Sequence, residues 1–124
     1  MILKLGNRDY EIRISFASID YLDRIYKVNV DGMMDYGVGL NMLVLGLQQE
    51  DLIVALNFIR AGTILEKQKP SNDEIEEYFG SLDEKGFTAF FKEALDCLKK
   101  QPLTKVKVSK ILKAKEKQAE KANA

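Results

Sequence analysis

Residues 36–49 read YGVGLNMLVLGLQQ, and this stretch decides the fold. Its main apolar residues recur at the spacing of one helical face, formed by Leu40, Leu43, Val44 and Leu47. Met42 makes a second side of the helix apolar as well. A helix that is apolar on more than one side is usually buried. We therefore expect residues 36–49 to form the central helix, with glycines 39 and 46 allowing a neighbouring backbone to approach closely.

Before this stretch, the first fourteen residues alternate between apolar and polar side chains, which predicts a β-hairpin with one buried face. The turn falls at residues 6–9. From Ser15 onward the apolar residues recur every three positions, which predicts a helix. A break follows at residues 29–32, where Asp31 and Gly32 favour a turn.

After the central stretch, three more helices are predicted. Asp51 is placed to cap one whose apolar stripe runs toward Leu65. Ser71 and Glu74 form the capping box of a short helix that Gly80 ends, and residues 81 and 84 repeat this box. The last of the three carries the clearest helical pattern and stops before the proline at 102. Its apolar residues are Phe87, Phe90, Phe91, Ala94, Leu95 and Leu98.

The C-terminal segment differs from the rest of the chain in its charge. Residues 99–124 hold nine lysines and two glutamates, a net charge of +7, so residues 1–98 of this neutral chain carry −7. Val108, Ile111 and Leu112 form a weak apolar face there, enough for a helix that is marginal alone. Such an arm either steers an acidic partner or solubilises the chain. Its lysines include Lys105, Lys107, Lys110, Lys113, Lys115 and Lys117.

These elements predict one α+β domain that is mainly α, with an N-terminal β-hairpin packed on a bundle of about five helices and a basic C-terminal arm. We place the globular domain at residues 1–101 and the lysine-rich arm, partly helical or disordered, at residues 102–124. A chain of 124 residues has room for one modest core.

The residue inventory argues against catalysis and cofactor binding. The chain has no histidine and a single cysteine, Cys97, so the usual general base and the common zinc sites are missing. No glycine-rich phosphate loop is present. We therefore expect no enzyme activity, no metal and no cofactor. The longest apolar stretch is too short to cross a bilayer, and no secretory signal is visible at Met1, which predicts a cytosolic protein.

Three side-chain groups have both a structural and a functional interpretation. Asp31 and Asp35 are better explained by a solvated turn than by a catalytic pair. The acidic run at residues 73–77 fits the first turn of a helix better than a cation site. The phenylalanines at 87, 90 and 91 line either a core or a peptide groove, and their helical spacing favours the core.

Surplus apolar surface is the feature that favours binding of other polypeptides. A two-stranded hairpin is barely stable unless it packs on something, and the central helix is apolar on more than one side. We expect leftover apolar surface to bind another copy of the chain or an apolar client helix. The residues predicted for this contact surface are Leu40, Leu43, Val44, Leu47 and Leu56, with Tyr36 and Met42 at the rim.

The N-terminal run LKLGNRDYEIRISF at residues 3–16, followed by Leu22 and Tyr26, resembles the opening of tail assembly chaperones from long-tailed phages of Gram-positive hosts. Residues 37–40 and the helix from Asp51 to Thr63 are similar as well. The likeness covers roughly residues 1–98 and rests on a hydrophobic and aromatic pattern. Two departures are a Gly-Asn turn where Asn-Gly is expected and a lysine arm without a counterpart.

This resemblance implies a non-enzymatic chaperone that coats the hydrophobic tape measure protein and keeps it soluble while tail-tube subunits polymerise around it. It implies self-association into a homo-oligomer, contact with the tail tube protein, and residence in the cytoplasm of the bacterial host but not in the mature virion. The first alternative is a structural tail completion or connector subunit. The second is a small nucleic-acid-binding regulator using the lysine arm, although the arm lacks arginine and aromatic residues for specific contacts.

Overall fold

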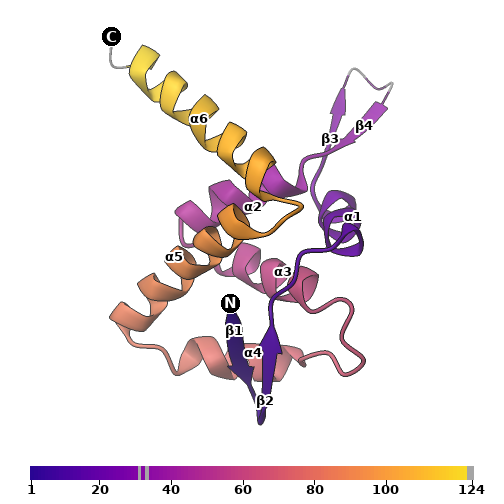
Figure 1. Cartoon of the computed structure of the whole chain (residues 1–124), viewed down its shortest axis with the longest axis vertical. Coiled ribbons are helices and arrows are strands. Elements are labelled where there is room, and N and C mark those ends of the chain that lie inside the picture. The colour runs from indigo at the N-terminus through magenta and orange to yellow at the C-terminus, as the bar shows by residue number, and fades with distance from the viewer. Residues whose placement is uncertain (31, 33, 123–124) are drawn as a thin grey trace.

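The computed structural model describes residues 1–30, 32 and 34–122 and shows a mainly helical α+β domain, as the sequence predicts (Figure 1). Two antiparallel hairpins and six helices make up the described part of the chain. The strands are β1 (Ile2–Leu5), β2 (Arg8–Glu11), β3 (Lys27–Val30) and β4 (Met34–Gly37). The helices are α1 (Phe16–Ile25), α2 (Gly39–Gln48), α3 (Leu52–Gly62), α4 (Asn72–Gly80), α5 (Glu84–Lys100) and α6 (Lys105–Ala122).

The N-terminal hairpin is confirmed, with one buried face, and its strand β1 packs on helix α4. Leu3 lies opposite Tyr10 in the register, and both side chains are buried. The turn requires glycine because Gly6 has a φ of +64° and a Cβ there would meet the Glu74 carboxylate of α4. Beyond β2, the Arg13 amide donates to the carbonyl of Gly62 at 3.0 Å, which fixes the hairpin against the end of α3.

A second hairpin, β3–β4, stands where the sequence predicted a break and the first turn of the central helix. Val28 lies opposite Tyr36, so the residues before Gly37 extend as a strand and α2 begins only at Gly39. The Asp23 carboxylate of α1 accepts from the Gly39 amide at 2.8 Å and marks that helix start. The predicted turn at Asp31 lies outside the described residues. Figure 1 shows this hairpin projecting from the helical body.

Helix α2 is the centre of the domain, as predicted, because it contacts α1, α3, α5 and α6. Leu43 and Val44 are fully buried, and the apolar sides of the helix face different neighbours. Both glycines of α2 permit close packing. A Cβ at Gly39 would lie 2.7 Å from the Leu22 Cβ of α1, and one at Gly46 would lie 2.3 Å from Val54 Cγ2 of α3.

Helix capping follows the sequence at α3 and α4 but not at α5. Asp51 accepts from the amides of the first turn of α3, and Ser71 with Glu74 forms the predicted capping box of α4. The second predicted box is wrong, because the N-cap of α5 is Asp83, which accepts from the Gly86 amide at 2.7 Å. Ser81 instead ends α4, where its amide donates to the carbonyl of Glu77.

The lysine-rich segment forms helix α6, whose first turns pack on the body. Val108 is fully buried and Ile111 is 9% exposed, in a helix that contacts α2 and α5. The loop before it is held by Gln101, whose amide nitrogen donates to the Ile12 carbonyl at 2.9 Å. The Ile14 amide donates back to the Gln101 Oε1 at 3.3 Å. The distal half of α6 extends away from the body (Figure 1).

Replacing Gly46 with alanine tests the contact between α2 and α3. Because the new Cβ would meet the buried Val54 side chain, we expect a loss of about 1–3 kcal/mol in unfolding free energy, measured by urea denaturation. Gly80→Ala is the matched control, since a Cβ there meets nothing within 4 Å. Equal stability of the two variants would contradict this account of the packing.

Candidate functional site

The structure places most of the predicted contact residues of α2 inside the core. Leu43 and Val44 are 0% exposed, Leu47 is 2% exposed and Leu40 is 9% exposed. This corrects the expected contact surface, because these side chains are enclosed by the four helices around α2 and are not accessible on the folded chain. Tyr36, on β4, and Met42 are exposed, but neither lines the apolar groove described below.

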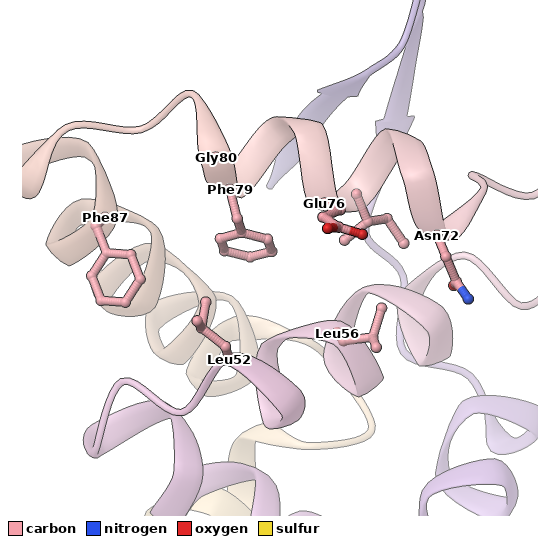
Figure 2. Close-up of a pocket in the computed structure, with 8 residues that line it drawn as sticks. Leu52, Leu56, Asn72, Glu76, Phe79, Gly80 and Phe87 are labelled. Atoms are coloured by element: carbon pink, nitrogen blue, oxygen red, sulfur yellow. The ribbon is translucent and has the colours of Figure 1, made fainter.

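Leu56 is the predicted contact residue that lies in a hollow of the surface. A groove of about 510 Å³ opens between α3, α4 and α5, and its lining is mainly apolar. In Figure 2, Leu52 and Leu56 of α3 lie across the groove from Phe79 of α4, with Phe87 of α5 at one end. The complete lining is Leu52, Leu56, Asn72, Ile75, Glu76, Phe79, Gly80 and Phe87.

Local sequence explains how α3 and α4 direct these residues into the groove. The cap at Asp51 starts α3 so that Leu52 and Leu56, four residues apart, share a face. The capping box starts α4 so that Ile75 and Phe79 share a face in the same way. Ile75 is 2% exposed and forms the floor, whereas Leu52 is 51% exposed at the edge. The groove is therefore apolar and open to solvent.

A cluster of aromatic rings supports the groove from below. Phe79 meets Phe90 at a ring-centroid distance of 4.8 Å in an edge-to-face arrangement, and Phe90 meets Phe91 at 5.2 Å. The ring centroids of Phe87 and Phe91 lie 5.0 Å apart. Such pairs add about 0.5–1.5 kcal/mol each beyond burial, so they stabilise the wall of the groove. The phenylalanine stripe serves the core at 90 and 91, as expected, while Phe87 is half-buried and lines the groove.

The polar side chains that α4 contributes to the groove are Asn72 and Glu76. Asn72 accepts a hydrogen bond from the Arg60 guanidinium at 2.6 Å, and Glu76 lines the same edge. Hydrogen bonds from the Ser71 backbone and side chain hold the pKa of Glu74 below its usual value, with Arg8 contributing. Burial raises the pKa of Tyr78, and the nearby Glu93 carboxylate adds to this.

The predicted basic arm forms a second charged surface on α6. Lys105, Lys107 and Lys110 are exposed, and so are Lys113 and Lys117. Lys115 differs from them, because it is half-buried and its ammonium donates to Gln48 Oε1 of α2 at 2.7 Å. That contact fixes the middle of α6 against the end of α2.

No group of three or more potential metal-ligating side chains was found among the described residues. The acidic residues of α4 act as a helix cap at Glu74 and as a solvated face elsewhere. Asp31 lies outside the described residues, as does the Asp35 side chain, so the aspartate pair has no structural description. No helix in the described ranges is long and apolar enough to cross a membrane.

The fold and the groove define a small, mainly helical domain with an open apolar groove on its surface. The chain also matches the family model described as phage tail assembly chaperone protein, TAC, over residues 2–113, and it belongs to this family. The match extends past residue 98 into the first half of α6. No curated protein and no solved structure matched the chain.

The lowered pKa of Glu74 makes stability depend on pH at the start of α4. A carboxylate whose folded pKa lies below its unfolded value stabilises the fold above the ordinary value of 4.5, and this stabilisation is lost as the pH falls through the folded pKa. We expect Glu74→Gln to lower the urea midpoint at pH 7 and to match the parent near pH 2. A constant difference across this range would contradict the assignment.

Proposed function

We propose that this chain binds apolar helical segments of the tape measure protein and keeps that long client soluble until the tail tube assembles around it. The observation that carries the proposal is an open apolar groove on a member of the tail assembly chaperone family. The proposed contact site is therefore this groove and not the buried leucines of α2. Of the residues predicted from the sequence, Leu56 is part of it.

The shape and lining of the groove suit an amphipathic helix. Helix-in-groove recognition uses apolar anchors at one helical spacing, and the facing rows Leu52–Leu56 and Ile75–Phe79 provide a seat for two such anchors. Burying one leucine-sized side chain yields about 1.5–3 kcal/mol, so each contact is weak. Weak contacts repeated along a client are reversible, which a chaperone needs if tube subunits are to displace it.

We further propose that the chain acts without enzymatic chemistry, in the host cytoplasm, and leaves before the virion is complete. Several copies would coat one client, and the tail tube protein would replace them. Mass spectrometry of purified virions checks this departure, with the tail tube protein as the positive control. Stoichiometric amounts of this chain in the virion would instead favour the structural tail completion or connector subunit.

Co-expression with the tape measure protein encoded alongside this chain tests the client. We expect the client to remain in the soluble fraction only when the chain is present and to elute with it as a multi-copy complex in size-exclusion chromatography with light scattering. An insoluble client in both cases, with no complex, would sink the proposal.

A matched pair of substitutions on α3 tests the groove. Leu52 lines the groove, whereas Ile53, the next residue, is 65% exposed and does not line it. We expect Leu52→Gln to weaken client binding about tenfold, because losing roughly half the burial of a leucine costs about 1–1.5 kcal/mol. Ile53→Gln should leave the affinity unchanged. Thermal unfolding of both variants should match the parent, since both side chains are exposed.

Equal affinities of the two variants for a soluble client fragment would show that the groove is not the contact site. Loss of binding in both variants would place the contact on the exposed start of α3 as a whole.

A further inference from the structure

The face of α4 that lines the groove has two rows of different chemistry. Ile75 and Phe79 form an inner apolar row opposite α3 (Figure 2). Asn72, Glu76 and Gly80 follow one another at steps of four residues, so they form an outer row along the same helix. The groove is therefore apolar across its width and polar along one edge.

Glu76 supplies the charge of that edge. Of the described residues that line the groove, it alone carries a formal charge. Figure 2 shows its carboxylate between Phe79 and Asn72, on the side of α4 that faces α3. The side chain is exposed, and neither of the ion pairs found in the described part of the chain includes it. Its charge is therefore accessible to a ligand that lies in the groove.

Arg60 of α3 contacts the other polar side chain of this edge and leaves Glu76 to solvent. The Arg60 guanidinium donates to Asn72 Oδ1 at 2.6 Å, one helical turn before Glu76. No ion pair joins Arg60 to the Glu76 carboxylate in the described structure. At the other end of the row, a Cβ on Gly80 would meet nothing within 4 Å. The edge thus has a cation at Asn72, a free carboxylate at Glu76 and open space at Gly80.

We propose that the groove selects apolar helical segments that carry a lysine or arginine about one turn from their apolar anchors, with the cation paired to Glu76. A helix seated with two apolar side chains between α3 and α4 presents the flanking residues of the same face to the edges of the groove. A basic flanking residue meets an opposite charge at Glu76, and an acidic one meets a like charge. The inference rests on the proposed client binding and names the chemistry of the segments that the groove accepts.

The charge of the whole body favours the same kind of segment. Residues 1–98 carry −7, so a basic segment is attracted before contact and an acidic segment is repelled. At the groove the ion pair is exposed, and an exposed pair changes an affinity by up to about fivefold. Apolar burial therefore provides most of the affinity, and Glu76 discriminates among apolar segments.

Binding of defined peptides tests this preference. The probes are alanine-rich peptides of about 20 residues, long enough to be helical in isolation, with two leucines four positions apart. The positions that flank the leucine face hold lysine, glutamine or glutamate. We expect the lysine peptide to bind the parent chain about two- to fivefold more tightly than the glutamine peptide, and the glutamate peptide to bind more weakly. Titrations of the isotope-labelled chain followed by NMR measure such weak affinities.

A pair of neighbouring substitutions on α4 is the decisive measurement. Glu76→Lys reverses the charge at the groove edge, whereas Glu77→Lys makes the same change in net charge at an exposed residue that does not line the groove. We expect Glu76→Lys to prefer the glutamate peptide and Glu77→Lys to retain the preference of the parent. Thermal unfolding of both variants should lie close to that of the parent, because both side chains are exposed.

Salt separates the charge preference from the apolar contact. Raising the salt from 0.1 M to 1 M shortens the screening length from about 10 Å to about 3 Å. The difference between the lysine and glutamate peptides should shrink accordingly, while binding of the glutamine peptide persists. A difference that stays constant in 1 M salt would contradict pairing with the Glu76 carboxylate.

Other outcomes would also overturn the proposal. Equal affinities of the three peptides for the parent would remove the selectivity and leave the groove as an apolar contact site. The same response in Glu76→Lys and Glu77→Lys would assign the preference to the charge of the whole body. A peptide of residues 105–122 that binds more tightly than the lysine peptide would assign the groove to a second copy of this chain.

Failure of the selectivity is distinguishable from failure of the proposed chaperone function. If no peptide binds the parent, the groove does not accept such helices and the selectivity is wrong. Co-expression with the tape measure protein measures client solubility independently of these peptides. A client that still needs the chain for solubility would then preserve the chaperone function with a different contact site.

Discussion

The close approach of α1 and α3 to the two glycines of α2 is the contact on which the rest of the domain depends. Gly39 admits the backbone and side chain of Leu22, and Gly46 admits the isopropyl group of Val54. A larger side chain at either position would push a neighbouring helix outward and open the core around Leu43. Because the neighbouring helices enclose Leu40, Leu43, Val44 and Leu47 of α2, the groove is formed by apolar side chains of α3, α4 and α5.

That geometry explains how a small domain can be stable and still expose apolar surface. The core side chains come from both ends of the chain, because Tyr10 and Ile12 of the N-terminal part pack in the same core as Leu98 and Val108. Gln101 joins these ends through hydrogen bonds to the backbone around Ile12 and Ile14. Leu52 of α3 stays half exposed outside this core and is accessible to another polypeptide.

Local signals in the sequence were sufficient for much of the fold and insufficient for the site. Alternation predicted the first hairpin, and side-chain capping predicted the starts of α3 and α4, because these features depend on residues close in sequence. The β3–β4 hairpin was missed because the pair Val28–Tyr36 spans the break that Gly32 suggested. The predicted helix cap at Ser81 was wrong because Asp83, two residues later, is the N-cap of α5. The same pattern describes a core leucine and a groove leucine, so only packing separates Leu43 from Leu56.

The placement of α6 also affects how the molecule meets other charged bodies. The basic helix α6 projects from a body of opposite net charge, so this neutral chain has an electric dipole directed from the body toward α6. In the field of a charged partner, a dipole feels a torque before contact, so the encounter starts from a favoured orientation. Oriented encounters raise the association rate more than they raise the lifetime of the complex. For the proposed client binding, this charge distribution predicts rapid capture together with weak individual contacts.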